Sequence, residues 1–111
     1  MERIDYLPLG TIVYLRSGMK KMIIITRGVV IANNDEVEFY DYGAVPYPEG
    51  IQSDQILYFQ HDWIKKVVFT GYSDQDDEMA VDIINEFLKD HPEIPRGFIP
   101  GSLEELHDEE E

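Results

Sequence analysis

A histidine next to an acid is the first arrangement in this 111-residue chain that could support chemistry. His61 precedes Asp62, and a carboxylate beside an imidazole can orient it as a general base. A surface histidine at a turn has the same local sequence, and we favour that interpretation. No serine lies in a Gly-x-Ser-x-Gly turn, and cysteine is absent, so the usual nucleophiles are missing. The sequence therefore predicts that the chain is not an enzyme.

An acidic run is the second such arrangement, because residues 74–78 resemble the start of a calcium-binding loop. That loop requires glycine at its sixth position and glutamate at its twelfth, where this chain has Met79 and Asn85. Helix capping accounts better for these acids, since the start of a helix favours negative charge. A glycine-rich phosphate-binding loop is also missing. We therefore expect no metal and no cofactor.

Residues 39–50 contain three tyrosines, two prolines and two glycines. Glycine and proline suit the backbone angles of a turn, but a turn does not need tyrosine. Tyrosine joins a large apolar ring to a polar tip, and several tyrosines on a stiff loop suit a binding surface. In the alternative interpretation, these rings cap the core of a small β domain. The candidate partner-binding residues are Tyr40, Asp41, Tyr42, Pro46, Tyr47, Pro48 and Glu49.

Five short segments with β patterning precede one helical segment, and these elements must position the residues above. The expected strands are residues 11–16, 20–32, 36–42, 55–60 and 65–71. Arg27 and Gly28 predict a bulge or sharp bend in the second strand, and residues 61–64 are typical of one helical turn. The order predicts a mainly β, α+β fold. We expect a five-stranded, strongly bent antiparallel sheet or an SH3-like barrel, with a C-terminal helix on its outside.

Alternation along the strands predicts which side chains are inward. In the third strand, Glu36, Glu38 and Tyr40 are expected to face outward. The side chains expected to be largely buried are Val13, Leu15, Ile23, Ile25, Val37, Phe39, Phe59, Val67 and Phe69.

The expected helix spans residues 74–90, with Ser73 as its N-cap and Pro92 beyond its end. Its apolar stripe, which we expect to pack on the sheet, consists of Ala80, Ile83, Ile84, Phe87 and Leu88. Residues 1–91 are thus expected to form one small barrel-like domain. Residues 92–111 combine three prolines with an acidic run and are expected to be a mostly disordered tail, in which Phe98 and Ile99 could dock locally.

The negative charge lies mainly in the C-terminal part. The net charge is −14, and residues 71–111 hold fourteen acids and two bases, a net of −12. This part would repel nucleic acid and anionic membrane, whereas a basic protein partner is compatible with it. The N-terminus lacks a signal-peptide pattern, and no apolar run is longer than residues 22–25, which are too few to span a membrane. With no cysteine, these features favour a cytoplasmic location.

The order of motifs resembles domain-of-unknown-function family 4176. The resemblance covers roughly residues 6–73, and its most specific part is Tyr-Asp-Tyr at residues 40–42 followed by Pro-Tyr-Pro-Glu-Gly at residues 46–50. The other segments that carry it are residues 7–13, 20–24, 59–64 and 67–72. The expected helix and the acidic tail lie outside the part that is similar.

The resemblance implies a cytosolic accessory protein without enzymatic activity. Members of that family are small proteins of Gram-positive bacteria, often encoded beside LXG-type polymorphic toxins of the type VII secretion system. The implied role is that of a chaperone or targeting factor that binds a cognate LXG-type toxin before export. Two alternatives stay open: an immunity protein that neutralises a secreted toxin, and a small domain that binds a regulatory ligand.

Overall fold

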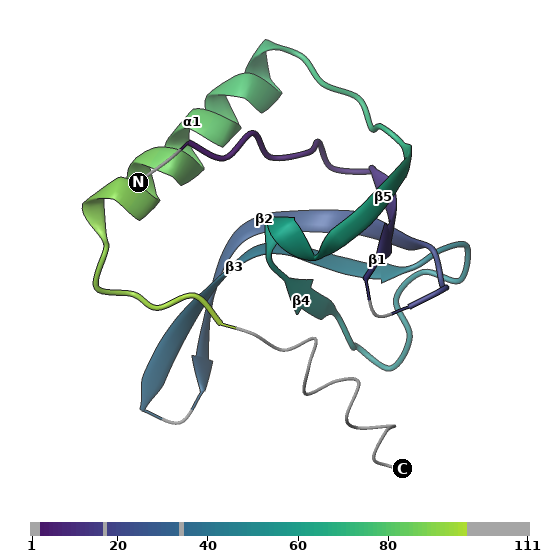
Figure 1. Cartoon of the computed structure of the whole chain (residues 1–111), viewed down its shortest axis with the longest axis horizontal. Coiled ribbons are helices and arrows are strands. Elements are labelled where there is room, and N and C mark those ends of the chain that lie inside the picture. Colours follow the sequence, from purple (N-terminus) through teal and green to yellow (C-terminus); the bar gives the residue numbers. More distant parts are fainter. Residues whose placement is uncertain (1–2, 17, 34, 98–111) are drawn as a thin grey trace.

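Long runs of β-branched and aromatic residues form the central hairpin, because such side chains favour extended backbone. The computed structural model describes residues 3–16, 18–33 and 35–97. Its elements are β1 (Ile12–Leu15), β2 (Met22–Asn33), β3 (Glu36–Pro46), β4 (Leu57–Phe59), the 3-10 turn η1 (His61–Trp63), β5 (Ile64–Phe69) and α1 (Gln75–Asp90) (Figure 1). The expected strands and helix are present, and the third strand continues to Pro46 instead of ending at residue 42.

The described strands form one antiparallel sheet in the order β4-β3-β2-β1-β5. β2 and β3 bend along their length (Figure 1). The predicted five-stranded, bent antiparallel sheet with one C-terminal helix is therefore confirmed. The sheet does not close into a barrel, since β4 and β5 are its two edges. η1 connects these edges directly along the chain, so they approach each other at residues 61–63.

A bulge in β2 changes which side chains face the core. Ile24 pairs with Ala44 and Thr26 pairs with Gly43, so Ile25 is an extra residue in the ladder. The predicted bulge is thus present in β2, but it lies at Ile25 and not at Arg27 and Gly28, where the pairing is regular. Gly28 itself has a φ of +62°, and a methyl group there would come within 2.9 Å of Ile84 on α1. The two features let the hairpin bend and let the helix approach it closely.

Part of the predicted core is wrong. Four of the nine residues are buried, namely Val13, Leu15, Phe39 and Phe59. Ile23 is half-buried, and four are exposed, namely Ile25, Val37, Val67 and Phe69. Ile25 lies at the bulge, Val37 lies near the free end of the hairpin, and the other two lie on the edge strand β5. Their places in the core are taken by Tyr6, Met22, Ile24, Tyr42 and Ala44.

The helix α1 begins one residue later than expected. Asp74, not Ser73, is the N-cap, because its carboxylate accepts a hydrogen bond from the Asp77 N–H at 3.1 Å. The buried residues of the helix are Val81 and Leu88. Ile83, which was expected to pack on the sheet, is 66% exposed, because the side of α1 that meets the body is the one carrying Val81.

Two of the contacts that hold α1 against the rest of the chain involve Asn85 and Phe87. The Asn85 side chain accepts from the Ile4 N–H at 2.8 Å and donates to the Ile4 carbonyl at 2.9 Å. The Phe87 ring stacks on Phe39, with ring centroids 6.2 Å apart. The N-terminal segment therefore runs along the helix, and the helix covers part of β3.

The segment after α1 folds back onto β3. The Phe39 N–H donates to the Pro95 carbonyl at 2.8 Å, and the Gly97 N–H donates to the Phe39 carbonyl at 3.0 Å. Residues 92–97, which were expected to belong to a disordered tail, thus include a short bridge to the sheet. The expectation for the rest of that tail, with Phe98 and Ile99, lies outside the described residues.

Candidate functional site

The structure separates the candidate partner-binding residues into two groups. Tyr40, Asp41 and Tyr42 lie inside β3 and are at most 1% exposed. Their placement on an exposed loop is wrong, because β3 runs unbroken between β2 and β4. The outward orientation expected for Tyr40 is also wrong. For these two tyrosines, the alternative interpretation, in which the rings belong to the core, is confirmed.

The second group forms the loop after β3. Pro46 ends the strand and is half-buried, whereas Tyr47, Pro48 and Glu49 are exposed. Lys20 forms an ion pair with Glu49 at 2.7 Å, and the Lys21 ammonium lies 5.7 Å from the centre of the Tyr47 ring. This loop is therefore held by the connection between β1 and β2 and keeps an aromatic ring at the surface.

The carboxylate of Asp41 is the centre of a polar cluster. It accepts hydrogen bonds from the Tyr6 hydroxyl at 2.6 Å and from the His61 N–H at 2.7 Å. The Arg96 guanidinium also donates to it and forms an ion pair with it. A buried carboxylate is stable only with such partners, and these three come from the N-terminal segment, η1 and the segment after α1.

Gln60 and Tyr42 extend this cluster. The Gln60 amide donates to the carbonyls of Phe39 at 2.8 Å and Gly97 at 2.7 Å, while its oxygen accepts from the Asp41 N–H at 3.1 Å. The Tyr42 hydroxyl accepts from the Leu7 N–H at 2.9 Å and lies 2.7 Å from His61 Nδ1. The network therefore fastens both ends of the domain to β3.

The electrostatics of the cluster keep its phenols neutral. Burial raises the pKa of Tyr6 far above its ordinary value, and the hydrogen bond to the Asp41 carboxylate raises it further. Burial likewise raises the pKa of Tyr42. Burial lowers the pKa of Arg96, but its hydrogen bond to Asp41 and the carboxylate charge outweigh that, so the net shift is upward. The cluster thus contains one ion pair, between the buried Asp41 and the partly exposed Arg96, among neutral donors.

A cleft of about 560 Å³ opens beside this cluster, lined among others by Arg16, His61, Trp63 and Arg96. Orientation of His61 by Asp62, the possibility that the sequence analysis did not favour, is not what the structure has. Its Nδ1 faces the Tyr42 hydroxyl, and its backbone N–H is bound by Asp41. Within the described residues, no group of three or more His, Cys, Asp or Glu side chains could hold a metal ion.

Sequence reasoning missed Tyr6, Gln60 and Arg96. Their partner Asp41 is 35 residues from Tyr6 and 55 residues from Arg96, so no local pattern joins them. One signal was available for Arg96, since it is one of only two bases in residues 71–111. A base in a strongly acidic segment is a candidate for an ion pair.

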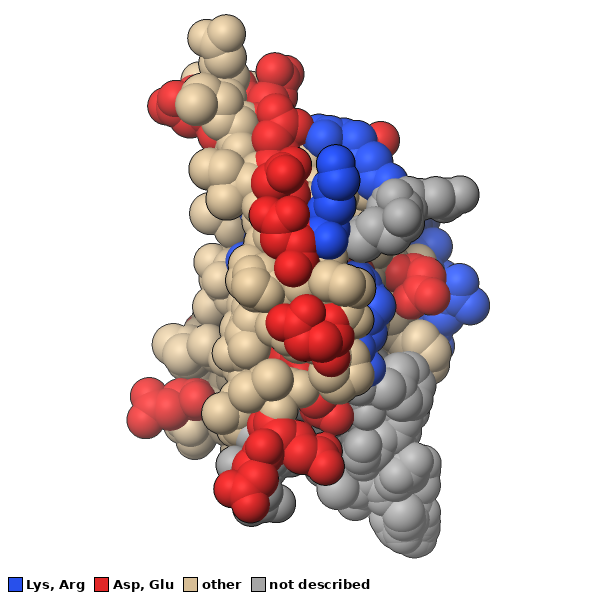
Figure 2. Space-filling model, turned by 90° about the vertical axis from the view of Figure 1, so that its left-hand side faces the viewer, with Lys and Arg blue, Asp and Glu red and all other residues tan. Residues whose placement is uncertain are grey.

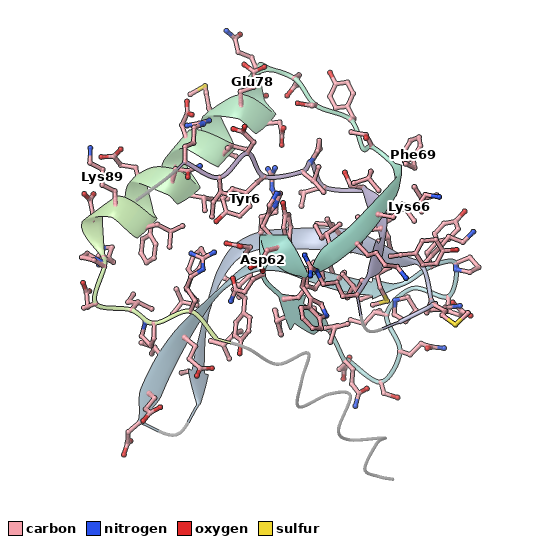
Figure 3. All side chains as sticks on the ribbon, in the orientation of Figure 1. Tyr6, Asp62, Lys66, Phe69, Glu78 and Lys89 are labelled. Atoms are coloured by element: carbon pink, nitrogen blue, oxygen red, sulfur yellow. The ribbon has the colours of Figure 1, made fainter. Side chains whose placement is uncertain are left out.

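A row of exposed apolar side chains lies on the edge strand β5. Val67, Val68 and Phe69 are consecutive, and Phe69 is 59% exposed. Figure 3 shows the labelled Phe69 and Lys66 on β5, on the opposite side of the view from Lys89 of α1. Beyond β5, Tyr72 is also exposed. Among the described residues, the outer edge of β5 has no strand partner.

The fold and the site define a small α+β protein with one bent open sheet, an internal polar cluster and an apolar sheet edge. Residues 6–80 match the family described as "Domain of unknown function (DUF4176)". Because this match covers more than half of the chain, the protein belongs to that family. The matched part also extends beyond residue 73, into the first turns of α1.

No curated protein and no solved structure matches the chain. Within the described residues, no helix combines the length and apolar character needed to cross a membrane.

Proposed function

We propose that this protein is a cytoplasmic, non-enzymatic accessory factor that binds an LXG-type toxin of the type VII secretion system before export. The observation that carries protein binding is the edge strand β5, with Val67, Val68 and Phe69 exposed in a row. The toxin as partner is supported by membership of the family and by the association stated above for its members.

An open sheet edge suits the capture of an extended segment of another protein. The unpaired N–H and C=O groups of β5 can pair with an added strand, and the neighbouring apolar side chains add contact area. Large apolar residues at such an edge are also a risk for aggregation unless a partner covers them. A secreted toxin held before export would cover them in the producing cell.

The polar cluster supports a role other than catalysis. The groups most suited to acid–base chemistry, Asp41 and His61, are bound to Tyr6, Arg96 and Tyr42. These contacts join distant chain segments, which is a structural task. The Tyr47 loop is a second candidate surface for the same partner, because its ring is exposed and supported by Lys21.

Co-expression with the two parts of a cognate LXG-type toxin tests this proposal. We expect the full chain to co-purify with the N-terminal region of the toxin and not with its toxic C-terminal domain. Contact with the C-terminal domain alone would instead support the immunity alternative. Failure to co-purify with either part would refute the toxin as partner.

A matched pair of variants tests the surface. Phe69→Ser should reduce co-purification by at least about fivefold, since an exposed aromatic anchor of this kind typically contributes more than about 1 kcal/mol to binding. Met19→Ser, at a residue that is 90% exposed in the turn after β1, should leave it unchanged. Equal binding by both variants would exclude the β5 edge as the site.

A further inference from the structure

The outward face of α1 carries a stripe of five residues with alternating spacings of three and four. We call Asp76, Met79, Ile83, Glu86 and Asp90 the outer stripe. At 100° per residue, these positions lie on the side of the helix opposite to the buried Val81. Spacings of three and four are those with which one helix packs along another.

Two apolar side chains occupy the middle of the outer stripe. Met79 is 58% exposed and Ile83 is 66% exposed, four residues apart. The inward face of the helix already attaches it to the rest of the domain through buried Val81 and Leu88 and through the two hydrogen bonds between Asn85 and Ile4. Met79 and Ile83 are therefore not needed for packing of α1 on the sheet.

The negative charges at the two ends of the outer stripe are not balanced by an ion pair with a described residue. Asp77 forms an ion pair with Arg27 at 2.8 Å, and Asp82 forms one with Arg3 at 2.7 Å, so these two acids are balanced within the domain. Asp76, Glu86 and Asp90 form no ion pair with any described residue. Figure 2 shows a row of acidic side chains along the upper part of this side of the molecule, which α1 occupies, with Lys and Arg side chains directly beside the row.

We propose that the outer stripe docks a basic amphipathic helix of another protein. Such a helix would place two apolar residues against Met79 and Ile83 and lysine or arginine against the acids at either end. The stripe runs about 21 Å along the helix axis, which corresponds to about four turns of a partner helix. The helix-in-groove mode of recognition uses apolar anchors at this spacing.

Charge argues against a second copy of the chain as the occupant. In an antiparallel pair of α1 helices, Asp76 would face Asp90, and in a parallel pair every acid would face its own copy. Both arrangements bring like charges together, which destabilises the contact. Anionic lipid is disfavoured for the same reason. A basic helix is the occupant that satisfies both the apolar centre and the acidic ends.

This inference goes beyond the proposed function, because it assigns a second surface and a partner chemistry that does not depend on the toxin. A partner that engaged both surfaces would bind the chain through α1 and β5 together. If the toxin fails to co-purify, the proposal that α1 docks a basic helix still stands. If the basic peptide fails to bind α1, the proposal of a toxin partner still stands.

Binding of a designed peptide tests the outer stripe directly. The probe is an amidated leucine–lysine peptide of about 18 residues, with leucines at spacings of three and four, labelled for fluorescence anisotropy. A scrambled peptide of the same composition, which cannot form an apolar face, is the control for charge attraction. We expect the amphipathic peptide to bind the full-length chain at least about tenfold more tightly than the scrambled one, with affinity falling as salt rises.

Matched variants locate the binding surface. Ile83→Ser should weaken binding of the amphipathic peptide by at least about tenfold, whereas Met19→Ser, at an exposed apolar residue outside α1 and β5, should leave it unchanged. The triple change Asp76→Asn, Glu86→Gln and Asp90→Asn should weaken binding mainly at low salt. The charge-matched control Glu36→Gln, Asp54→Asn and Asp62→Asn should have a smaller effect. All these positions are exposed, so the variants should fold.

Changes in the NMR chemical shifts of backbone amides when the peptide is added provide an independent measurement. The largest shifts are expected along the outer stripe. Equal binding of the scrambled peptide, an unchanged affinity for Ile83→Ser, or shifts concentrated outside α1 would each overturn the proposal.

Discussion

At the scale of single residues, Asp41 shows how a buried carboxylate can join distant parts of a small domain. An isolated buried charge is costly, so the residue needs donors and an opposite charge nearby. Tyr6, His61 and Arg96 supply them from three separate segments. The resulting cluster joins these three segments to β3 beside the apolar core.

The tyrosines around Asp41 predict how stability depends on pH. In the folded chain, burial raises the pKa of Tyr6 and Tyr42 above the ordinary value of 10, and burial with a hydrogen bond to Glu38 raises that of Tyr40 to about 12. Below pH 10 these phenols are protonated whether the chain is folded or not. Above pH 10 only the unfolded chain releases the protons, so the free energy of unfolding falls by about 1.4 kcal/mol per pH unit for each tyrosine.

Urea unfolding of the native chain and Tyr6→Phe between pH 8 and pH 11 measures this effect. Tyr6→Phe loses its hydrogen bond to Asp41, which should cost about 1–3 kcal/mol at pH 8. The gap between the two proteins should then narrow above pH 10, because the variant has no phenol at this position to ionise. Parallel curves across the whole range would show that Tyr6 is not protected from ionisation.

At the scale of elements, the contact between β2 and α1 depends on a missing side chain. Gly28 combines a φ of +62° with Ile84 atoms at 2.9–3.2 Å from the position of an added methyl group. Gly28→Ala should therefore introduce both backbone strain and crowding and lower the free energy of unfolding by about 2–4 kcal/mol. Chemical denaturation monitored by circular dichroism provides the measurement.

Gly50→Ala is the matched control for this substitution. Gly50 has a φ of +82°, but no atom lies within 4 Å of an added methyl group, so only the backbone strain remains. Its cost should be about 1–2 kcal/mol. If both substitutions cost the same, crowding by Ile84 does not limit how closely α1 approaches the hairpin.

The positions of the elements along the chain could be predicted from the sequence, but which of their side chains point into the core could not. β-branched runs separated by turn residues predict the strands, and Pro92 with the acidic first turn predicts α1. In β2, apolar residues occupy both faces, so alternation cannot decide between Ile23 and Ile24, and the bulge at Ile25 shifts the pattern further. For Val67 and Phe69, exposure follows from the place of β5 at the sheet edge, which only the topology reveals.

The candidate site shows the same division. The loop residues Tyr47, Pro48 and Glu49 could be placed at the surface because prolines and glycines mark a turn. The buried positions of Tyr40 and Tyr42 could not, since an aromatic strand and an aromatic loop have similar composition. The partners of Asp41 depend on contacts between residues 35 and 55 positions apart, which no local rule predicts.

At the scale of the whole molecule, the segment after α1 determines where the domain ends. Residues 95–97 pair with Phe39, and Arg96 neutralises Asp41. A chain ending at residue 91 loses both contacts and leaves the Asp41 charge buried without its cation. We expect this truncation to lower the free energy of unfolding by about 2–4 kcal/mol. This is near the low end for breaking a buried ion pair, because Arg96 is 38% exposed and partly screened by solvent.

A chain ending at residue 100 is the control for that truncation. It keeps Arg96 and removes only residues 101–111, which are charged and lack an apolar pattern, so its stability should match that of the full chain. Asp41→Asn should recover part of the loss in the chain ending at 91, since the amide carries no charge to bury, but should destabilise the full chain. Thermal and urea unfolding of the full chain, the chain ending at 91 and the Asp41→Asn form of each gives a double-mutant cycle between Asp41 and the C-terminal segment. Additive effects would show that the segment acts independently of the Asp41 charge. A chain ending at residue 100 that is as unstable as the chain ending at 91 would show that residues 101–111 are part of the folded domain.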